Sequence, residues 1–236
     1  MATIAVNGAN GRMGSRILAL AKEAGDLKLA GAFDENSSTR LSAVELKKNG
    51  KGVLIDFSSP AGTKTATEAA LEAGWGLVVG TTGLEAKELD GLKKASERIP
   101  VVVSSNMSVG VNLVIELLEL LSKKAPADFN IEITEAHHIH KKDAPSGTAL
   151  MLLNAIVGSK GWDAPRARQE KERIKSIREG ETVGDHSVLF SGPAETIELK
   201  HHARSRDIFA GGALVAARFL ASAKPGLYTM RDVLRK

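Results

Sequence analysis

Apolar and polar residues follow a regular pattern up to the turn at 104–107. Short, wholly apolar runs predict buried strands, and longer stretches with apolar residues three or four positions apart predict helices. Glycine, proline or serine separates the two kinds of segment. This alternation predicts a parallel sheet covered by helices on both faces. The predicted strands are 3–6, 27–33, 53–57, 76–79 and 100–103, and the predicted helices are 61–73, 85–97 and one through 17–21.

The pattern changes after residue 110. Apolar helices are predicted at 111–121 and 150–157, and strands become more frequent than helices. Because strands with few helices between them favour a mixed or antiparallel sheet, we expect a second domain of the α+β class. The expected division is a Rossmann-like domain at 1–107 and 206–236, and a second domain at 108–205. The later elements are strands at 129–135, 174–178, 187–190 and 195–200, an amphipathic helix at 213–223 and a tail at 230–236.

The first predicted strand runs directly into Gly8-Ala-Asn-Gly11-Arg-Met-Gly14, which opens the next helix. This spacing is a variant of the dinucleotide fingerprint, in which the glycines allow a tight turn, close approach of a pyrophosphate and helix packing. Asp34 ends the next strand, where an acidic residue binds ribose hydroxyls and repels the 2′-phosphate of NADP. Arg12 would partly offset that repulsion, so both NADH and NADPH are candidates. A plain strand–turn–helix is the alternative.

Three more turns follow predicted strands: Asp56-Phe-Ser-Ser-Pro60, Gly80-Thr-Thr-Gly83 and Ser104-Ser-Asn-Met107. In an open parallel sheet, ligands bind beyond the carboxyl ends of the strands. We therefore expect these turns to share one crevice near the nicotinamide and its ribose. Ordinary loop chemistry is the alternative.

The segment richest in side chains that can transfer protons or bind anions is Glu135-Ala-His-His-Ile-His-Lys-Lys-Asp-Ala-Pro-Ser-Gly-Thr-Ala149. Imidazoles exchange protons near neutral pH, and ammonium groups bind carboxylates. The backbone N–H groups of Ser146, Gly147 and Thr148 would lie at a helix N-terminus, where anions bind. The segment therefore predicts a site that holds and protonates a small, multiply anionic substrate.

Two other functions compete with this interpretation. A metal-dependent hydrolase would use His138 and His140, because His-x-His is a ligand spacing, but few further ligands are left for it. A regulator that binds NAD(H) without turnover would need a DNA-reading helix, and no helix-turn-helix is found after the glycine-loop domain. We therefore expect no metal and no nucleic-acid partner.

Composition narrows the compartment and the partners. The chain has 236 residues, no cysteine, 4% aromatic residues and a formal net charge of +4. The absence of cysteine excludes disulfides and suits a reducing cytoplasm. No apolar run approaches the roughly 18 residues that a membrane helix needs. We expect a cytoplasmic protein that does not bind membranes and acts on anionic metabolites.

Taken together, these motifs resemble the 4-hydroxy-tetrahydrodipicolinate (dihydrodipicolinate) reductases of the diaminopimelate route to lysine, over nearly the whole chain. The resemblance rests on the glycine loop, the three turns, Asn106–Asn112 and above all the segment from Glu135 to Thr148. It implies that NADH or NADPH reduces 4-hydroxy-2,3,4,5-tetrahydrodipicolinate, a cyclic imine dicarboxylate. It also implies a homotetramer that assembles through the sheet of the second domain.

The resemblance assigns roles to individual residues. His137 matches an acid/base histidine and Lys141 a proton-donating lysine. His138, Gly147 and Thr148 match substrate contacts. Since Lys142 directly follows Lys141, the division of roles among His137, Lys141 and Lys142 is left open. The implied cofactor contacts are Gly8, Ala9, Asn10, Gly11, Arg12, Met13, Asp34, Gly80, Thr81, Thr82, Ser104, Ser105, Asn106 and Met107.

Overall fold

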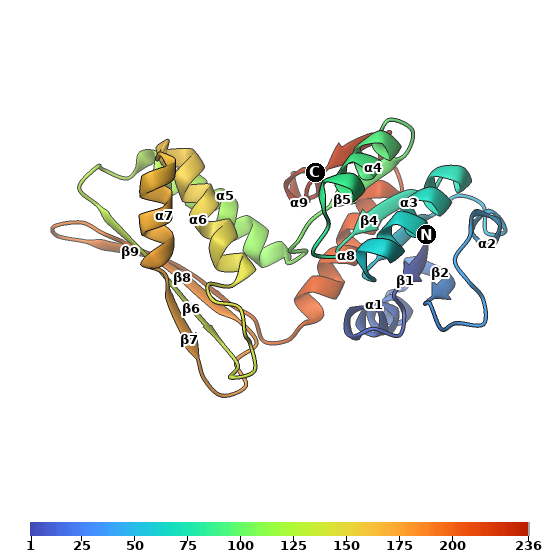
Figure 1. Ribbon diagram of the computed structural model, residues 1–236, viewed down its shortest axis with the longest axis horizontal. Helices are drawn as coiled ribbons and strands as arrows, with labels where there is room; N and C mark the ends of the chain where they lie inside the picture. The colour runs from blue at the N-terminus through green and yellow to red at the C-terminus, as the bar shows by residue number, and fades with distance from the viewer. Residues whose placement is uncertain (236) are drawn as a thin grey trace. The chain divides into compact units, whose positions relative to one another are not determined.

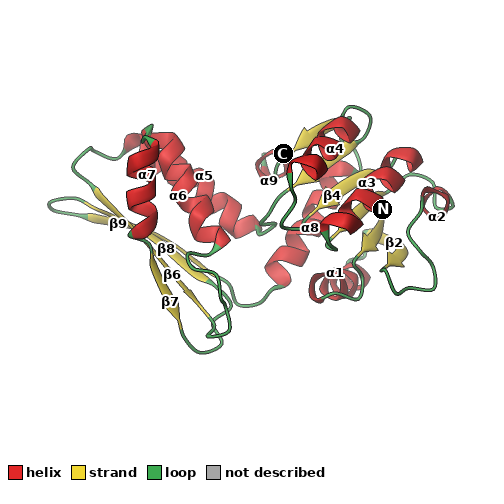
Figure 2. Cartoon of the chain, in the orientation of Figure 1, coloured by secondary structure: helices red, strands yellow, loops and turns green. Residues whose placement is uncertain are grey.

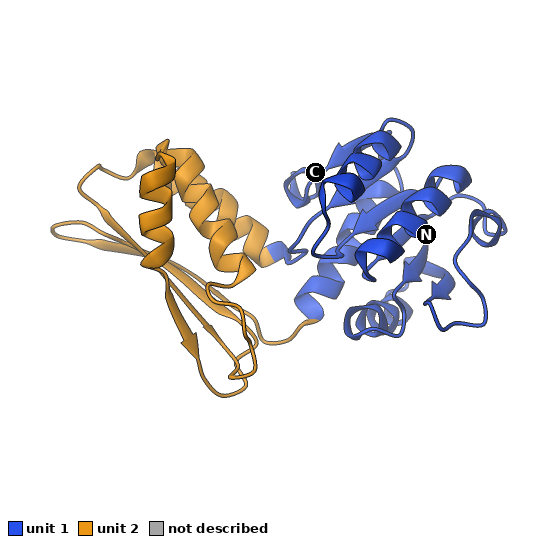
Figure 3. Cartoon of the chain, in the orientation of Figure 1, with its two compact units in different colours: residues 1–109, 207–236 blue, residues 110–206 orange. Residues whose placement is uncertain are grey.

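The chain folds into two compact units, seen in a computed structural model that describes residues 1–235. One unit comprises Met1–Val109 and the chain from Asp207 onward, and the other comprises Gly110–Arg206 (Figure 3). The first segment of the chain therefore builds most of unit 1, and the last segment completes it.

Unit 1 contains a six-stranded parallel sheet in the order β10-β5-β4-β3-β1-β2 (Figure 1). The chain moves outward from β1 to β2 and then crosses back to place β3 on the other side of β1. This reversal is the switch point at which ligands bind in open parallel sheets. The strands are β1 (Ala2–Asn7), β2 (Leu27–Phe33), β3 (Val53–Asp56), β4 (Gly76–Val79), β5 (Pro100–Val103) and β10 (Gly226–Tyr228).

Helices cover both faces of this sheet, and each face has its own hydrophobic core. The central strands are buried on both sides, so β3 is apolar at Val53, Leu54 and Ile55 without alternation. One core is closed by α1 (Arg12–Glu23), α8 (Asp207–Leu220) and α9 (Met230–Leu234). The other is closed by α2 (Ala43–Lys47), α3 (Pro60–Ala73) and α4 (Ala86–Ser96).

Unit 2 contains a four-stranded mixed sheet in the order β7-β6-β8-β9. Strand β6 pairs parallel with β7 and antiparallel with β8, which pairs antiparallel with β9. The helices of the unit lie on one face of the sheet (Figure 2). The strands are β6 (Asn130–His137), β7 (Lys175–Arg178), β8 (Asp185–Ser191) and β9 (Thr196–His202), and the helices are α5 (Val109–Lys124), α6 (Gly147–Lys160) and α7 (Ala164–Glu172).

The fold class predicted from the pattern is confirmed, but several elements differ. The predicted helix at 150–157 begins at Gly147, and the one at 213–223 begins at Asp207 and ends at Leu220. Part of the predicted tail is helix α9, and Lys236 lies outside the described residues. The short elements α2, α7 and β10 were not predicted. Helix α7 buries none of its residues, so it has no apolar stripe to detect.

Candidate active site

The glycine loop is built by backbone that lies too close to its surroundings for side chains. Gly8 has a positive φ of 78°, and a Cβ there would lie 2.3 Å from the carbonyl oxygen of Phe57. A Cβ on Gly14 would lie 2.0 Å from the carbonyl oxygen of Gly8. Gly11 caps helix α1 without a side-chain hydrogen bond, which leaves backbone N–H groups of the first turn for an anion. These features fit a dinucleotide pyrophosphate.

A cavity of about 510 Å³ adjoins this loop. Asp34 lies on it, and one oxygen of its carboxylate accepts a hydrogen bond of 3.1 Å from the backbone N–H of Asn10. The size suits part of a dinucleotide. Glu35 and Arg40 share the cavity, whereas Arg12, which the sequence suggested as the charge facing Asp34, does not line it. The lining is Asn7, Gly8, Gly11, Asp34, Glu35, Arg40, Leu41, Phe57, Ser58, Ser59, Ala61, Gly62 and Thr65.

A fully buried carboxylate, Asp56, ties the strand ends around the loop together. It accepts hydrogen bonds from Asn7 Nδ2 at 2.7 Å and from the hydroxyls of Thr63 and Thr81 at 2.6 and 2.8 Å. The backbone N–H of Ser58 also donates to the Thr81 hydroxyl at 3.0 Å. The turns at 56–60 and 80–83 therefore lie against each other at the carboxyl ends of β3 and β4. Sequence reasoning placed Asp56 in a turn and missed this role.

The predicted cofactor residues differ in their exposure to solvent. Asn10, Gly11, Arg12, Thr82 and Ser105 are exposed. In contrast, Ala9, Thr81, Asn106 and Met107 are buried. Met107 belongs to the core, where its carbonyl oxygen lies 1.7 Å from the position of a Cβ on Gly212. Any cofactor contact from Met107 would therefore come from backbone atoms. Met13, Asp34 and Ser104 are half-buried, and Gly8 and Gly80 are buried.

In unit 2, strand β6 ends at His137 and leads through a turn into α6. Alternation along the strand places Glu135 and His137 on the same, covered face of the sheet. His137 Nδ1 forms a very short hydrogen bond with Glu135 Oε2, and Arg178 Nη2 donates to Glu135 Oε1 at 2.8 Å. The sequence contained the signal for the first pair in its i, i+2 spacing. The Arg178 contact comes from another strand and was missed.

The charges of this group follow from burial and from its partners. Burial would raise the pKa of Glu135, but the hydrogen bond from Arg178, with contributions from Ser176 and His137, lowers it below its usual range. Burial lowers the pKa of His137, and the Glu135 carboxylate only partly offsets this. Near neutral pH, Glu135 is therefore ionised and His137 neutral. Its Nδ1 then carries the proton shared with Glu135, and Nε2 is the free acceptor.

A second histidine, His186 on β8, packs edge-to-face against His137 with ring centroids 5.1 Å apart. Its Nε2 lies 3.1 Å from the hydroxyl of Ser146, which also caps helix α6 by accepting from the N–H of Ala149. Burial, with a smaller contribution from His137, lowers the pKa of His186 to about 4. His186 is therefore neutral and joins β8 to the start of α6, where Gly147 is exposed and Thr148 half-buried.

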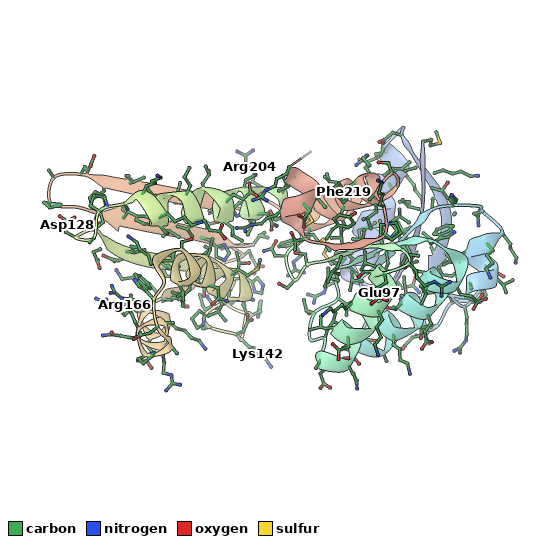
Figure 4. The ribbon with its side chains drawn as sticks, turned by 90° about the horizontal axis from the view of Figure 1, so that it is seen from above. Glu97, Asp128, Lys142, Arg166, Arg204 and Phe219 are labelled. Carbon is green, nitrogen blue, oxygen red and sulfur yellow. The ribbon has the colours of Figure 1, made fainter. Side chains whose placement is uncertain are left out.

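The remaining basic residues follow β6. The side chain of Lys141 is 22% exposed, and its Nζ lies 2.8 Å from Asp143 Oδ1. That ammonium lowers the pKa of Asp143, so the pair is ionised. Lys142 is exposed and lies at the edge of its unit in Figure 4. His138 Nδ1 is buried and has no hydrogen-bond partner within residues 1–235, as expected of an atom that a ligand would satisfy.

The metal-dependent hydrolase is not supported by this geometry. Within the described residues, the one group of three or more side chains close enough to hold a metal ion is Glu135, His137 and His186. The predicted ligands, His138 and His140, are not part of it. Their rings lie 6.1 Å apart and have no carboxylate with them in such a group. In addition, Glu135 already neutralises Arg178.

Fold and site together define a dinucleotide-dependent oxidoreductase. Sequence comparison is more specific: "Dihydrodipicolinate reductase, N-terminus" matches residues 2–107, and "Dihydrodipicolinate reductase, C-terminus" matches residues 110–234. The chain belongs to the dihydrodipicolinate reductase family. No helix in the described part of the chain is long and apolar enough to cross a membrane.

Individual relatives agree with this assignment. The 4-hydroxy-tetrahydrodipicolinate reductase of Nitrosomonas eutropha is 42% identical over 261 residues, covering 98% of this chain and 97% of that protein. The enzyme of the same name from Nitrosomonas europaea is 39% identical over 260 residues, covering 98% and 97%. The dipicolinate-bound dihydrodipicolinate reductase from Paenisporosarcina sp. TG-14 has the same fold, with a TM-score of 0.83 at 22% identity and 97% of both chains covered.

Proposed function

We propose that this chain catalyses the NAD(P)H-dependent reduction of 4-hydroxy-2,3,4,5-tetrahydrodipicolinate to 2,3,4,5-tetrahydrodipicolinate, a step of diaminopimelate and lysine biosynthesis. The observation that carries the proposal is the buried Glu135–His137 pair, close in sequence to Lys141 and to a helix N-terminus at Ser146. This arrangement lies within the part of the chain that matches the C-terminal family region. Overall, the reaction removes the C4 hydroxyl as water and adds a hydride and a proton.

Unit 1 would hold the reductant. The glycine loop and the start of α1 would bind the pyrophosphate, because Gly8 and Gly14 leave no room for side chains there. Asp34 would bind the ribose hydroxyls at the edge of the cavity. When bound, the reduced nicotinamide supplies the hydride.

Unit 2 would hold the substrate. One carboxylate would accept hydrogen bonds from the backbone N–H groups of Gly147 and Thr148 at the start of α6. The other would bind His138, whose buried Nδ1 has no partner among the described residues. Two fixed carboxylates leave the six-membered ring little freedom to rotate, which reduces the entropic part of the barrier.

Proton transfer would fall to His137 and Lys141. Because burial keeps His137 neutral near pH 7, it is placed to accept a hydrogen bond or a proton at Nε2. The Lys141 ammonium, with its counter-ion Asp143 at 2.8 Å, would donate the proton that the reduced ring requires. A well-placed acid contributes roughly 10²–10⁴-fold to the rate.

Assembly and location belong to the same proposal. We infer a homotetramer formed through the face of the unit 2 sheet opposite its helices, and a cytoplasmic enzyme. On that face, the residues of β6 and β8 that alternate with the buried ones, such as Thr134, Ala136 and Leu189, are only half-buried, so the face is left for another layer. Light scattering at micromolar concentration would measure the assembly directly.

The activity is tested by following the loss of NADH and of NADPH at 340 nm with freshly generated substrate, with and without a chelator. We expect substrate-dependent oxidation that the chelator leaves unchanged. Calorimetry with each nucleotide, and with dipicolinate as a planar dicarboxylate probe, separates the two binding steps. If neither nucleotide produced heat, the proposal would be wrong.

A further inference from the structure

The guanidinium of Arg178 lies among the backbone and carboxylate groups that set the positions of both proposed proton-transfer residues. Arg178 is the last residue of β7, and it is paired in register with His137 on β6. Side chains at paired positions of neighbouring strands lie on the same face of a sheet, so Arg178 reaches the covered face on which Glu135 and His137 also lie.

One half of the guanidinium is directed at the histidine. Nη2 donates to Glu135 Oε1 at 2.8 Å, and the other oxygen of the same carboxylate holds His137 Nδ1. Glu135 is completely buried, so Arg178 supplies the positive charge that allows a carboxylate there. An ionised Glu135 fixes the tautomer of His137, because it accepts the Nδ1 proton and leaves Nε2 free.

The other bonds of the guanidinium are directed at the loop that carries the lysine. Nη2 also donates to the carbonyl oxygen of Asp143 at 2.5 Å, and Nε donates to the carbonyl oxygen of Lys141 at 3.3 Å. A further bond, from Nη1 to the carbonyl of Ile177 at 2.7 Å, holds the guanidinium itself against β7. A rigid planar fork can meet several acceptors at fixed angles, which a lysine ammonium cannot do.

We propose that Arg178 is a positioning residue that fixes His137, through Glu135, and the Lys141 backbone in one arrangement. The inference rests on the proposed function, because it assumes that His137 and Lys141 act in proton transfer. It predicts that loss of the fork lowers turnover without weakening dinucleotide binding, since the bonds of Arg178 all lie within unit 2.

Truncation of Arg178 to alanine would leave space for a small cation, so the proposal can be tested by chemical rescue. In Arg178→Ala, we expect kcat to fall about 100-fold, the size of effect that misplacement by about 1 Å produces. The KM for NADH should stay within about twofold. Added guanidinium, at concentrations below those that unfold the protein, should raise the kcat of the variant at least about tenfold, whereas methylammonium should not. Arg173→Ala is the matched control, because Arg173 is exposed and, among residues 1–235, its one ion pair is with Glu170.

Two further variants cover the case in which the alanine variant does not fold. Arg178→Lys keeps the charge but loses the fork, and we expect at least about a tenfold loss of kcat. Glu135→Gln should lose a similar factor, and the double variant Arg178→Lys/Glu135→Gln should be no slower than the slower single variant, because both act through one unit. The thermal midpoint of each variant is measured alongside.

The outcomes distinguish the two proposals. A kcat within about threefold of wild type in Arg178→Lys, or a loss in Arg178→Ala that guanidinium does not restore, would overturn the role of Arg178 while leaving the reaction in place. Wild-type turnover in alanine variants of His137 and Lys141 would instead remove the catalytic assignment on which this inference rests.

Discussion

The two proposed binding regions of this protein are built on opposite principles. The glycine loop of unit 1 works through missing side chains, since a Cβ on Gly14 would fall 2.0 Å from a carbonyl oxygen. The histidine segment of unit 2 brings together polar side chains that are hydrogen-bonded to one another: the Glu135 carboxylate, the neutral His137 ring and the Arg178 guanidinium. The first region offers backbone dipoles to a phosphate, and the second offers groups that titrate.

This difference determines how each region should respond to change. A site built from backbone atoms is disrupted when a side chain is added, because the surrounding packing leaves no space for it. A network of buried side chains is disrupted when one of them is truncated, because its buried partner then loses a hydrogen bond or a counter-charge. Adding a group to the glycine loop and removing groups from the histidine segment therefore test this contrast.

Removing the Lys141 ammonium should have the largest effect of all. In Lys141→Ala, we expect turnover to fall by about 10²–10⁴-fold, because the reduced ring would lose its proposed proton donor. Binding of NADH, measured by calorimetry, should be unchanged, since Lys141 belongs to unit 2. Lys142→Ala is the control, because that exposed neighbour should be dispensable. If Lys142→Ala were the slower variant, the assignment would pass to Lys142.

Because His186 is buried, we expect the free energy of unfolding of unit 2 to fall in acid. Its pKa of about 4 lies below the ordinary value near 6.5, so the unfolded chain binds the extra proton first as the pH falls. Stability should therefore decrease between about pH 6.5 and pH 4, by about 3 kcal/mol from this group alone. Urea unfolding of the wild type and of His186→Gln at pH 7 and pH 4.5 measures it. The variant should show a smaller difference between the two pH values; an equal difference would place the proton elsewhere.

These two regions also differ in how far they could be predicted from the sequence. The glycine loop depends on three glycines, a preceding strand and Asp34, all within one strand–helix–strand unit, so a local pattern was enough. The Rossmann-like sheet followed for the same reason, since its strands are apolar runs separated by turns.

The histidine site was predicted only in part. The residue types and the helix start at Ser146 were visible, but the partners of the histidine come from elsewhere in the chain. Arg178 is on β7 and His186 on β8, and only the strand order β7-β6-β8 brings them to β6. A short strand such as Lys175–Arg178 gives no sign of its neighbour in its sequence. Likewise, β10 has too few residues to show periodicity.

Adding one methyl group to the glycine loop tests the other side of the comparison. In a helix, alanine is normally favoured over glycine by about 1 kcal/mol. In Gly14→Ala we expect the reverse, a loss of about 2 kcal/mol in the free energy of unfolding, because the Cβ would meet backbone that cannot move away easily. Affinity for NADH should fall at least about tenfold, since the loop must shift.

Gly91→Ala is the matched control for that substitution. Gly91 is also helical, in α4, and a Cβ there would have no neighbour within 4 Å. It should gain up to about 1 kcal/mol and keep its nucleotide affinity. Equal effects in the two variants would show that crowding does not define the loop.

The smallest effect should come from the charge at the edge of the cavity. Asp34 is half-buried beside the loop, and a 2′-phosphate bound at that position would face its carboxylate. Repulsion between partly solvated charges is on the order of 1–2 kcal/mol, so Asp34→Asn should raise kcat/KM for NADPH relative to NADH by about tenfold. Arg40→Ala should shift the ratio the other way, because Arg40 is a cation that lines the same cavity. Asp90→Asn, an exposed change on α4 that leaves the cavity untouched, is the control. If neither Asp34→Asn nor Arg40→Ala changed the ratio, charge at this edge would not select the cofactor, and unit 1 would discriminate by shape alone.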